Sequence, residues 1–211
     1  MNVKTYAESE FNIEEILRYA GCKGSPDETV SLVKGCIGQV RQSLVYKVCY
    51  TRLPDLSFTE ADSADLTKQL RHCDEIVLFA ATIGLEIDRL VAKYGHTSPS
   101  KALIFQAIGA ERIENLCDQF CAEIESEANA QGRRTQPRFS PGYGDLPLSM
   151  QRDIFRVLDC PRKIGLTLNE SLLMSPTKSV TAIIGIKDGA PSHKHKKCSD
   201  CPKIDCTFRS E

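Results

Sequence analysis

One short segment of the sequence, Arg138-Phe139-Ser140-Pro141-Gly142-Tyr143, combines a cation, an aromatic ring and a turn-forming pair. Proline fixes its own φ and glycine accepts a positive φ, so Pro141-Gly142 predicts a tight turn with exposed backbone. Arg138 could pair with a carboxylate, and the ring of Tyr143 could stack on a flat or cationic group. The segment therefore suits a small ligand that carries both features. An ordinary surface loop is the alternative interpretation, since short loop motifs are weak evidence.

A second set of reactive side chains lies near the end of the sequence, where Cys198, Cys201 and Cys206 follow His193 and His195. Two cysteines in a CxxC pair can place two thiolates on one metal ion, and thiolates favour iron–sulfur clusters and zinc. The three cysteines leave either site one ligand short, which a histidine could supply for zinc. An iron–sulfur cluster, a zinc site and free or redox-active thiols therefore all remain open.

The composition indicates an intracellular, water-soluble protein. With 211 residues, 41% of them hydrophobic, the chain is long enough to bury a real core. It has no run of about 18 apolar residues, and its start lacks the basic-then-apolar layout of a signal peptide, so we expect a cytoplasmic protein and no membrane partner. Most of the ten cysteines are scattered through regular-looking segments, which indicates reduced thiols rather than a disulfide framework.

The charges are distributed unevenly along a chain whose formal net charge is −1. Residues 1–130 contain 13 Lys/Arg against 20 Asp/Glu, whereas residues 131–211 contain 14 against 8. Neither part is basic enough to indicate a nucleic-acid partner. The basic part suits an acidic protein or an anionic cofactor, and a mixed solvated surface fits the same counts.

Capping signals and hydrophobic periodicity predict both helices and strands. Asn12 and Glu15 form a capping-box pattern that starts a short helix ending at Gly21, and Ser25-Pro26 starts a second helix that runs to about Leu44. Further helices are predicted at 85–94, from Ser98-Pro99 to about 130, and at 149–159, and strands at 45–52, 75–82, 164–168 and 179–186.

The mixed order of these elements predicts an α+β fold, with a central, mainly antiparallel twisted sheet flanked by helices. We assign residues 1–186 to this domain and residues 187–211 to a short Lys-, His- and Cys-rich tail. On the long helix, an apolar stripe faces the core, and Glu114 lies beside that stripe, where its carboxylate would be partly buried; the stripe comprises Ile113, Leu116, Phe120 and Ile124.

Three motifs in fixed order resemble the C-terminal activation domain of cobalamin-dependent methionine synthase. They are Arg138–Tyr143, Gly165–Ser171 and Met174–Val180, and the segments 80–86 and 111–118 resemble the same family more weakly. The resemblance implies a domain that binds S-adenosylmethionine and supports the reductive methylation of inactive cob(II)alamin. It also implies binding and positioning rather than catalysis, so no catalytic residue is expected in this chain.

The resemblance also implies roles for individual residues. Arg138 would hold the carboxylate of S-adenosylmethionine, and Tyr143 would face the sulfonium. The backbone of Ser140, Pro141 and Gly142 would contact its polar atoms. Glu114 matches an acidic position of the family and could receive the amino group, although an ordinary helix-surface glutamate fits equally well.

The sequence lacks the Asp-x-His-x-x-Gly segment that supplies a histidine ligand to cobalt in this family. We therefore expect a free-standing activation subunit that acts on cobalamin held by a corrinoid-binding methionine synthase subunit, with a flavodoxin-like or ferredoxin-like electron donor. Two alternatives stay open: an iron–sulfur or zinc-containing reductive activator of another corrinoid methyltransferase, and a structural adaptor that does not bind S-adenosylmethionine.

Overall fold

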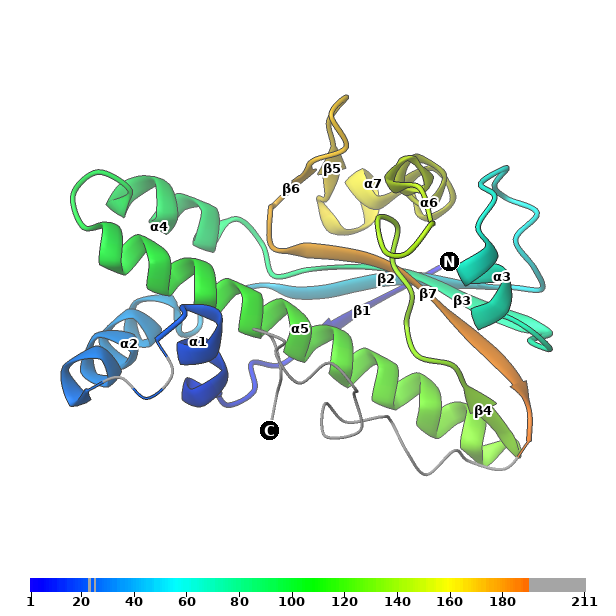
Figure 1. The fold of residues 1–211 in the computed structure, drawn as a ribbon, viewed down its shortest axis with the longest axis horizontal. Coiled ribbons are helices and arrows are strands. Elements are labelled where there is room, and N and C mark those ends of the chain that lie inside the picture. The colour runs from blue at the N-terminus through cyan, green and yellow to red at the C-terminus, as the bar shows by residue number, and fades with distance from the viewer. Residues whose placement is uncertain (23, 25, 190–211) are drawn as a thin grey trace.

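A five-stranded antiparallel sheet lies at the centre of the computed structural model, which describes residues 1–22, 24 and 26–189 (Figure 1). Each strand is antiparallel to its neighbour, and helices cover both faces. This arrangement confirms the predicted α+β fold with a mainly antiparallel sheet. In spatial order the strands are β1 (Asn2–Tyr6), β2 (Tyr46–Leu53), β3 (Glu75–Thr82), β7 (Ser179–Asp188) and β4 (Arg133–Thr135).

Strand β3 shows why the sheet separates two cores. Successive side chains of a strand point to opposite faces. Val77, Phe79 and Ala81 accordingly belong to the larger core, and Ile76, Leu78 and Ala80 belong to the smaller core on the other face. A strand that is covered on both faces reads as a continuous apolar run, and residues 76–81 of the sequence form such a run.

The larger core is covered by four helices, α1 (Ile13–Tyr19), α2 (Asp27–Val40), α4 (Glu86–Tyr94) and α5 (Pro99–Ala130). Helix α5 runs along the length of the sheet (Figure 1). Its predicted apolar stripe is buried, and Phe120 packs its ring 5.1 Å from that of Tyr50 and 4.9 Å from that of Phe79. Within the described part of the chain, no helix combines the length and apolarity needed to cross a membrane.

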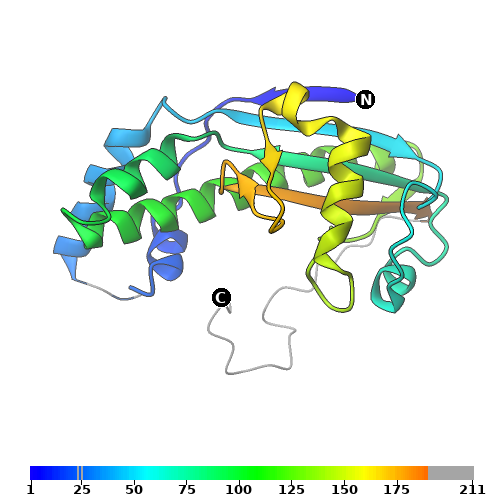
Figure 2. The ribbon, with the colours of Figure 1, turned by 90° about the horizontal axis from the view of Figure 1, so that it is seen from above.

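The opposite face carries shorter elements, and these contribute the smaller core. They are α3 (Ala64–Gln69), the 3₁₀ turn η1 (Leu148–Met150), α6 (Gln151–Leu158), α7 (Cys160–Ile164) and the hairpin of β5 (Thr167–Leu168) and β6 (Met174–Ser175). Figure 2 shows α6 and α7 lying across the central strands, where Ile154, Leu158 and Ile164 are buried.

Two predicted boundaries are wrong, for local backbone reasons. The second helix ends at Val40 rather than near Leu44, because Gln42 adopts a positive φ of 66° and reverses the chain while Leu44 stays buried. The strand predicted at 164–168 pairs only at Thr167–Leu168. Ile164 instead completes α7, which ends at Gly165 with a φ of 70°.

The predicted capping box at Asn12 forms only in part. Asn12 Oδ1 accepts the Glu15 N–H at 3.1 Å, as expected, but the Glu15 carboxylate pairs with Arg18. The backbone N–H of Asn12 donates instead to Glu111 Oε1 on α5, at 3.3 Å. The start of α1 is therefore tied to the long helix, a contact between distant segments that local sequence patterns do not reveal.

Gly185 gives a test of how tightly the segment that follows α3 packs on β7. A Cβ atom at this buried position would lie 2.6 Å from Cys73 Sγ and 2.7 Å from Leu70 Cδ2. We predict that Gly185→Ala lowers the free energy of unfolding by about 1–3 kcal/mol, because both side chains must shift in a close-packed layer. Urea denaturation followed by circular dichroism measures the change.

Gly38→Ala is the matched control, because a Cβ there meets nothing within 4 Å and Gly38 lies inside α2. Alanine costs less backbone entropy than glycine in a helix, so this variant should gain about 0.5–1 kcal/mol. Equal effects of the two substitutions would contradict the packing argument.

Candidate ligand-binding site

The Arg138–Tyr143 segment is held over the sheet by pairing with β7. After β4, the Gln136 N–H donates to the Gly185 carbonyl at 2.7 Å, and Phe139 exchanges two 2.9 Å backbone hydrogen bonds with Ile183. The chain then reverses at the predicted turn. The Tyr143 N–H donates to the Ser140 carbonyl at 3.2 Å, and Gly142 adopts a φ of 90°, which suits the third position of a type II turn.

Arg138 joins this segment to α5. Its Nη2 atom lies 2.5 Å from Glu114 Oε2, its Nη1 atom lies 2.5 Å from Asp118 Oδ1, and Nη1 also lies 3.8 Å from Cys121 Sγ. Burial opposes the charged form, but the hydrogen bond to Asp118 and the charges of Asp118 and Glu114 raise the pKa of Arg138 above its ordinary range. Arg138 is therefore a permanent cation with two carboxylate partners.

These contacts change the predicted role of Arg138. The sequence suggested an arginine available for a ligand carboxylate, whereas both of its terminal nitrogens already donate to α5. Glu114 keeps 42% of its side chain exposed, so the pair presents a cation and an anion side by side. Such a pair complements a zwitterion that brings both an ammonium and a carboxylate. The guanidinium of Arg138 has further N–H groups that are available to donate to the carboxylate of such a ligand.

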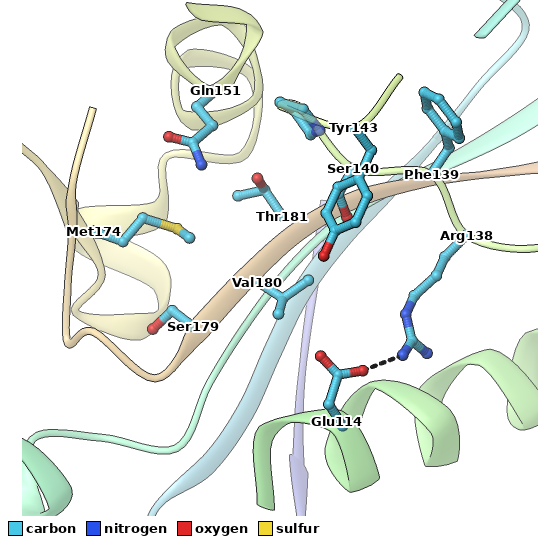
Figure 3. A pocket seen from close by; sticks show the side chains of 11 residues that line it. Glu114, Arg138, Phe139, Ser140, Tyr143, Gln151, Met174, Ser179, Val180 and Thr181 are labelled. Carbon is cyan, nitrogen blue, oxygen red and sulfur yellow. Dashed lines mark hydrogen bonds and ion pairs between the residues drawn. The ribbon is translucent and has the colours of Figure 1, made fainter. Parts of the chain in front are cut away.

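A pocket of about 430 Å³ opens beside this ion pair (Figure 3). Five elements contribute to it: α5, the loop that contains the turn, α6, β6 and the start of β7. The lining residues are Glu114, Arg138, Phe139, Ser140, Pro141, Tyr143, Gln151, Met174, Ser179, Val180 and Thr181.

Five of the six ligand-binding residues predicted from the sequence line this pocket. They are Glu114, Arg138, Ser140, Pro141 and Tyr143, while Gly142 forms the turn next to them. The ring of Tyr143 is 70% exposed, and its hydroxyl points toward Glu114 (Figure 3). An aromatic ring at a pocket mouth can cover a bound cation with its face.

The other two sequence motifs take different positions. In the Met174–Val180 motif, Met174, Ser179 and Val180 line the pocket, and Ser179 Oγ hydrogen-bonds Thr82 Oγ1 at 2.8 Å. The Gly165–Ser171 motif lies outside the lining. Its Asn169 accepts the Leu173 N–H at 2.9 Å, which closes the β5–β6 hairpin and thereby supports Met174.

Sequence reasoning missed Gln151 and Thr181, which are 5% and 3% exposed. Neither belongs to a motif, and a polar residue next to a periodic apolar pattern carries no signal that it is buried. A second hollow of about 500 Å³ lies on the other side of Arg138, against Asp118, Cys121 and Ile184.

The described residues contain no group of three His, Cys, Asp or Glu side chains that could hold a metal ion. Cys198, Cys201 and Cys206 lie in 190–211, outside the described residues. Cys117 and Cys121 occupy one face of α5, where burial raises the pKa of both thiols. Both side chains pack in or against the larger core.

Asp145, two residues after the Arg138–Tyr143 segment, fastens the end of this segment to α3. Its carboxylate accepts hydrogen bonds from the Ser63 hydroxyl, the Ala64 N–H at 2.8 Å and the Asp65 N–H at 3.2 Å. Asp65 Oδ2 in turn accepts the Asp145 N–H at 3.3 Å. A Cβ on the preceding Gly144 would overlap Asp65 Oδ2, and Gly144 also has a positive φ of 55°. The turn is thus anchored on both sides.

Comparisons with known proteins agree with one another. Residues 59–200 match the family model described as "Vitamin B12 dependent methionine synthase, activation domain". The chain is also similar to a crystal structure of the MetH reactivation domain bound to AdoHcy, with a TM-score of 0.61 and 15% sequence identity. That match covers 92% of this chain and 80% of the other, and at this identity it shows the shared fold. No curated protein matches the sequence.

We predict that Asp145→Ala lowers the melting temperature at pH 7, and that this difference from the wild type shrinks in acid. The Ser63 hydroxyl, followed by the backbone N–H groups, lowers the pKa of Asp145. A carboxyl with a depressed folded-state pKa stabilises the fold above its unfolded pKa of about 3.9 and loses that effect as the pH falls through the folded value. Thermal unfolding from pH 7 down to about pH 3 tests this.

Asp62→Ala provides the comparison, since Asp62 is an exposed carboxylate directly before Ser63, the residue that Asp145 contacts. It should change the melting temperature little at any pH in this range. A pH-independent loss in Asp145→Ala would mean that packing, rather than the ionised cap, holds the loop.

Proposed function

Since its family model covers residues 59–200, this chain belongs to the vitamin B12-dependent methionine synthase activation-domain family, and we propose on that premise that it binds S-adenosylmethionine for cobalamin reactivation. In this function the domain supports the reductive methylation of inactive cob(II)alamin. A donor supplies one electron to form cob(I)alamin. The methyl group of the sulfonium then passes to cobalt, which leaves S-adenosylhomocysteine and methylcobalamin.

The observation that carries the proposal is the convergence of the motif residues on one pocket. Glu114 lies on α5, 24 residues before Arg138. Tyr143 follows Arg138 after a reversing turn. All three residues nevertheless line the same 430 Å³ pocket. A pocket of this size lies within the usual range for small ligands. Its charged wall suits the zwitterionic end of S-adenosylmethionine.

The ion pair of Glu114 and Arg138 gives the ligand two complementary contacts. The ligand's ammonium would approach Glu114, and its carboxylate would take hydrogen bonds from the guanidinium of Arg138. Asp118 continues to hold Nη1, so Arg138 stays in place while Glu114 turns to the ligand. We assign to Tyr143 the sulfonium, which its ring face would attract, and to Ser140–Gly142 the contacts made by backbone groups.

The partner of this site would be the cobalamin-binding part of a methionine synthase, with a flavodoxin-like or ferredoxin-like protein as electron donor. Apolar side chains near the pocket support a docking role: Tyr143 is 70% exposed, Leu173 is 65% exposed and Leu148 is 40% exposed. Exposed apolar groups that cluster at one site favour contact with another macromolecule.

Calorimetry tests ligand binding directly. We predict that the wild-type protein binds S-adenosylmethionine and S-adenosylhomocysteine, and that Tyr143→Ala weakens S-adenosylmethionine about tenfold because the cation loses the ring face. Since Tyr143 is mostly exposed, the fold should be unaffected. Arg71→Ala, which removes an exposed arginine remote from the pocket lining, should bind like the wild type.

A reconstitution assay tests the function itself. With a cob(II)alamin-loaded methionine synthase module, a reductant and S-adenosylmethionine, adding this chain should increase the rate at which the methylcobalamin spectrum appears. Tyr143→Ala should reduce that increase. Binding without any effect on methylcobalamin formation would rule out the reactivation role and leave a ligand-binding adaptor.

The C-terminal segment carries a separate proposal. Of the predicted tail, residues 187–211, Lys187 and Asp188 belong to β7 and pair with β4. We infer that the rest of the segment is distinct from the domain, and that Cys198, Cys201 and Cys206 hold an iron–sulfur cluster or zinc. The CxxC spacing supports this assignment. It also favours the alternative function, a metal-containing reductive activator of another corrinoid methyltransferase.

Anaerobic purification followed by iron, sulfide and zinc analysis distinguishes these possibilities. We predict about one metal centre per chain, and its loss in Cys198→Ser/Cys201→Ser. Cys22→Ser, which removes a partly exposed thiol elsewhere, should keep the metal. A metal-free native protein with full reactivation activity would eliminate both the metal site and the alternative function.

A further inference from the structure

Gln151 is the one lining residue of the 430 Å³ pocket whose side chain combines deep burial with an unmet hydrogen-bonding need. It is only 5% exposed, and its Oε1 atom is buried without a hydrogen-bond partner among the described residues. Native proteins pair the great majority of their buried polar groups. A buried carboxamide oxygen that has no partner and lies at a pocket wall is placed to accept a hydrogen bond from a ligand.

The position of Gln151 is fixed by its surroundings. It begins α6, and its backbone N–H is held by the carbonyls of Leu148 and Ser149 in the preceding 3₁₀ turn. The following turn of α6 is anchored by the buried side chains of Ile154 and Phe155. The carboxamide is therefore carried on a rigid element, as a recognition group requires.

The pocket has two chemically different ends (Figure 3). Glu114 and Arg138 form the charged end on one side, while Gln151 lies at the other side with Met174 and Thr181. This second end is neutral and includes the polarisable thioether of Met174, which packs favourably against aromatic rings. It suits a flat heterocycle that carries its own donors and acceptors.

We propose that Gln151 is a specificity-determining residue that reads the adenine base of the ligand. The inference rests on the proposed function, since it takes S-adenosylmethionine and S-adenosylhomocysteine as the ligands. A carboxamide offers one acceptor and one donor. Adenine offers the matching pair, because its 6-amino group donates and its N7 accepts.

A 6-oxo purine breaks this match. In S-inosylhomocysteine both O6 and N7 are acceptors, so one end of the Gln151 carboxamide stays unpaired whichever way it is turned. A site built to hydrogen-bond a ligand group binds an analogue weakly when that analogue lacks the matching donor or acceptor, because a buried polar group of the site is then left unpaired. Gln151 would thus exclude the deaminated ligand, which is otherwise the same size and charge.

Calorimetry with S-adenosylhomocysteine and S-inosylhomocysteine tests the assignment. Wild-type protein should prefer the adenine compound about tenfold. Gln151→Leu should weaken S-adenosylhomocysteine about tenfold and bind the two compounds about equally. Its melting temperature should be the same as or higher than that of the wild type, because an unpaired buried acceptor has been removed.

Two further variants complete the design. Gln106→Leu makes the same replacement at an exposed position of α5 and should leave both affinities unchanged. Gln151→Glu serves if the leucine variant does not fold. A carboxylate accepts from the 6-amino group but cannot donate to N7, so S-adenosylhomocysteine should bind more weakly while the preference for adenine persists.

The outcomes distinguish the role assigned to Gln151 from the proposed function of the whole site. If Gln151→Leu keeps the wild-type affinity and the preference for adenine, or loses both affinities equally, the assignment to Gln151 is overturned while the proposed function stands. A lowered melting temperature with unchanged ligand preference would show a purely structural role. If wild-type protein binds neither compound, the proposed function itself fails.

Discussion

The ion pairs of Arg138 with Glu114 and Asp118 are the constraint on which the site depends. They join a loop that has little regular structure to the longest helix of the domain, at 2.5 Å on each side. Backbone pairing of Phe139 with Ile183 fixes the same loop to β7, and Asp145 fixes its far end to α3. These three contacts fix the position of the Pro141-Gly142 turn relative to the sheet. In this position the turn forms part of the pocket wall.

The parts that the sequence predicted well are those whose signals are local and periodic. The strand at 75–82 and the helix to Ala130 have the predicted bounds, because a long apolar run and a sustained stripe have few alternative structures. Five of the six residues predicted to bind a ligand also line one pocket. The sequence did not reveal their partners, since the pairing of Arg138 with Asp118 and of Asn12 with Glu111 depends on how distant segments pack.

Gln151 shows most clearly what sequence reasoning cannot reach. As the residue before an amphipathic helical pattern it resembles any solvated glutamine, and only the packing of α6 on the sheet makes it buried. An unsatisfied buried acceptor costs about 1–3 kcal/mol. Local inconsistencies of this kind gather at functional sites, which agrees with the recognition role that we propose for Gln151.

The place of β7 in the sheet has a consequence for how the site comes into being. Among the described strands β7 is the last in sequence, yet it lies between β3 and β4 and contributes Ser179, Val180 and Thr181 to the pocket. During synthesis the ribosome releases β1, β2, β3 and β4 first, so a nascent chain holds an open edge at β3 until β7 emerges. The pocket is complete only after that strand has been inserted, so a ligand of the proposed site would bind only to chains in which β7 has joined the sheet.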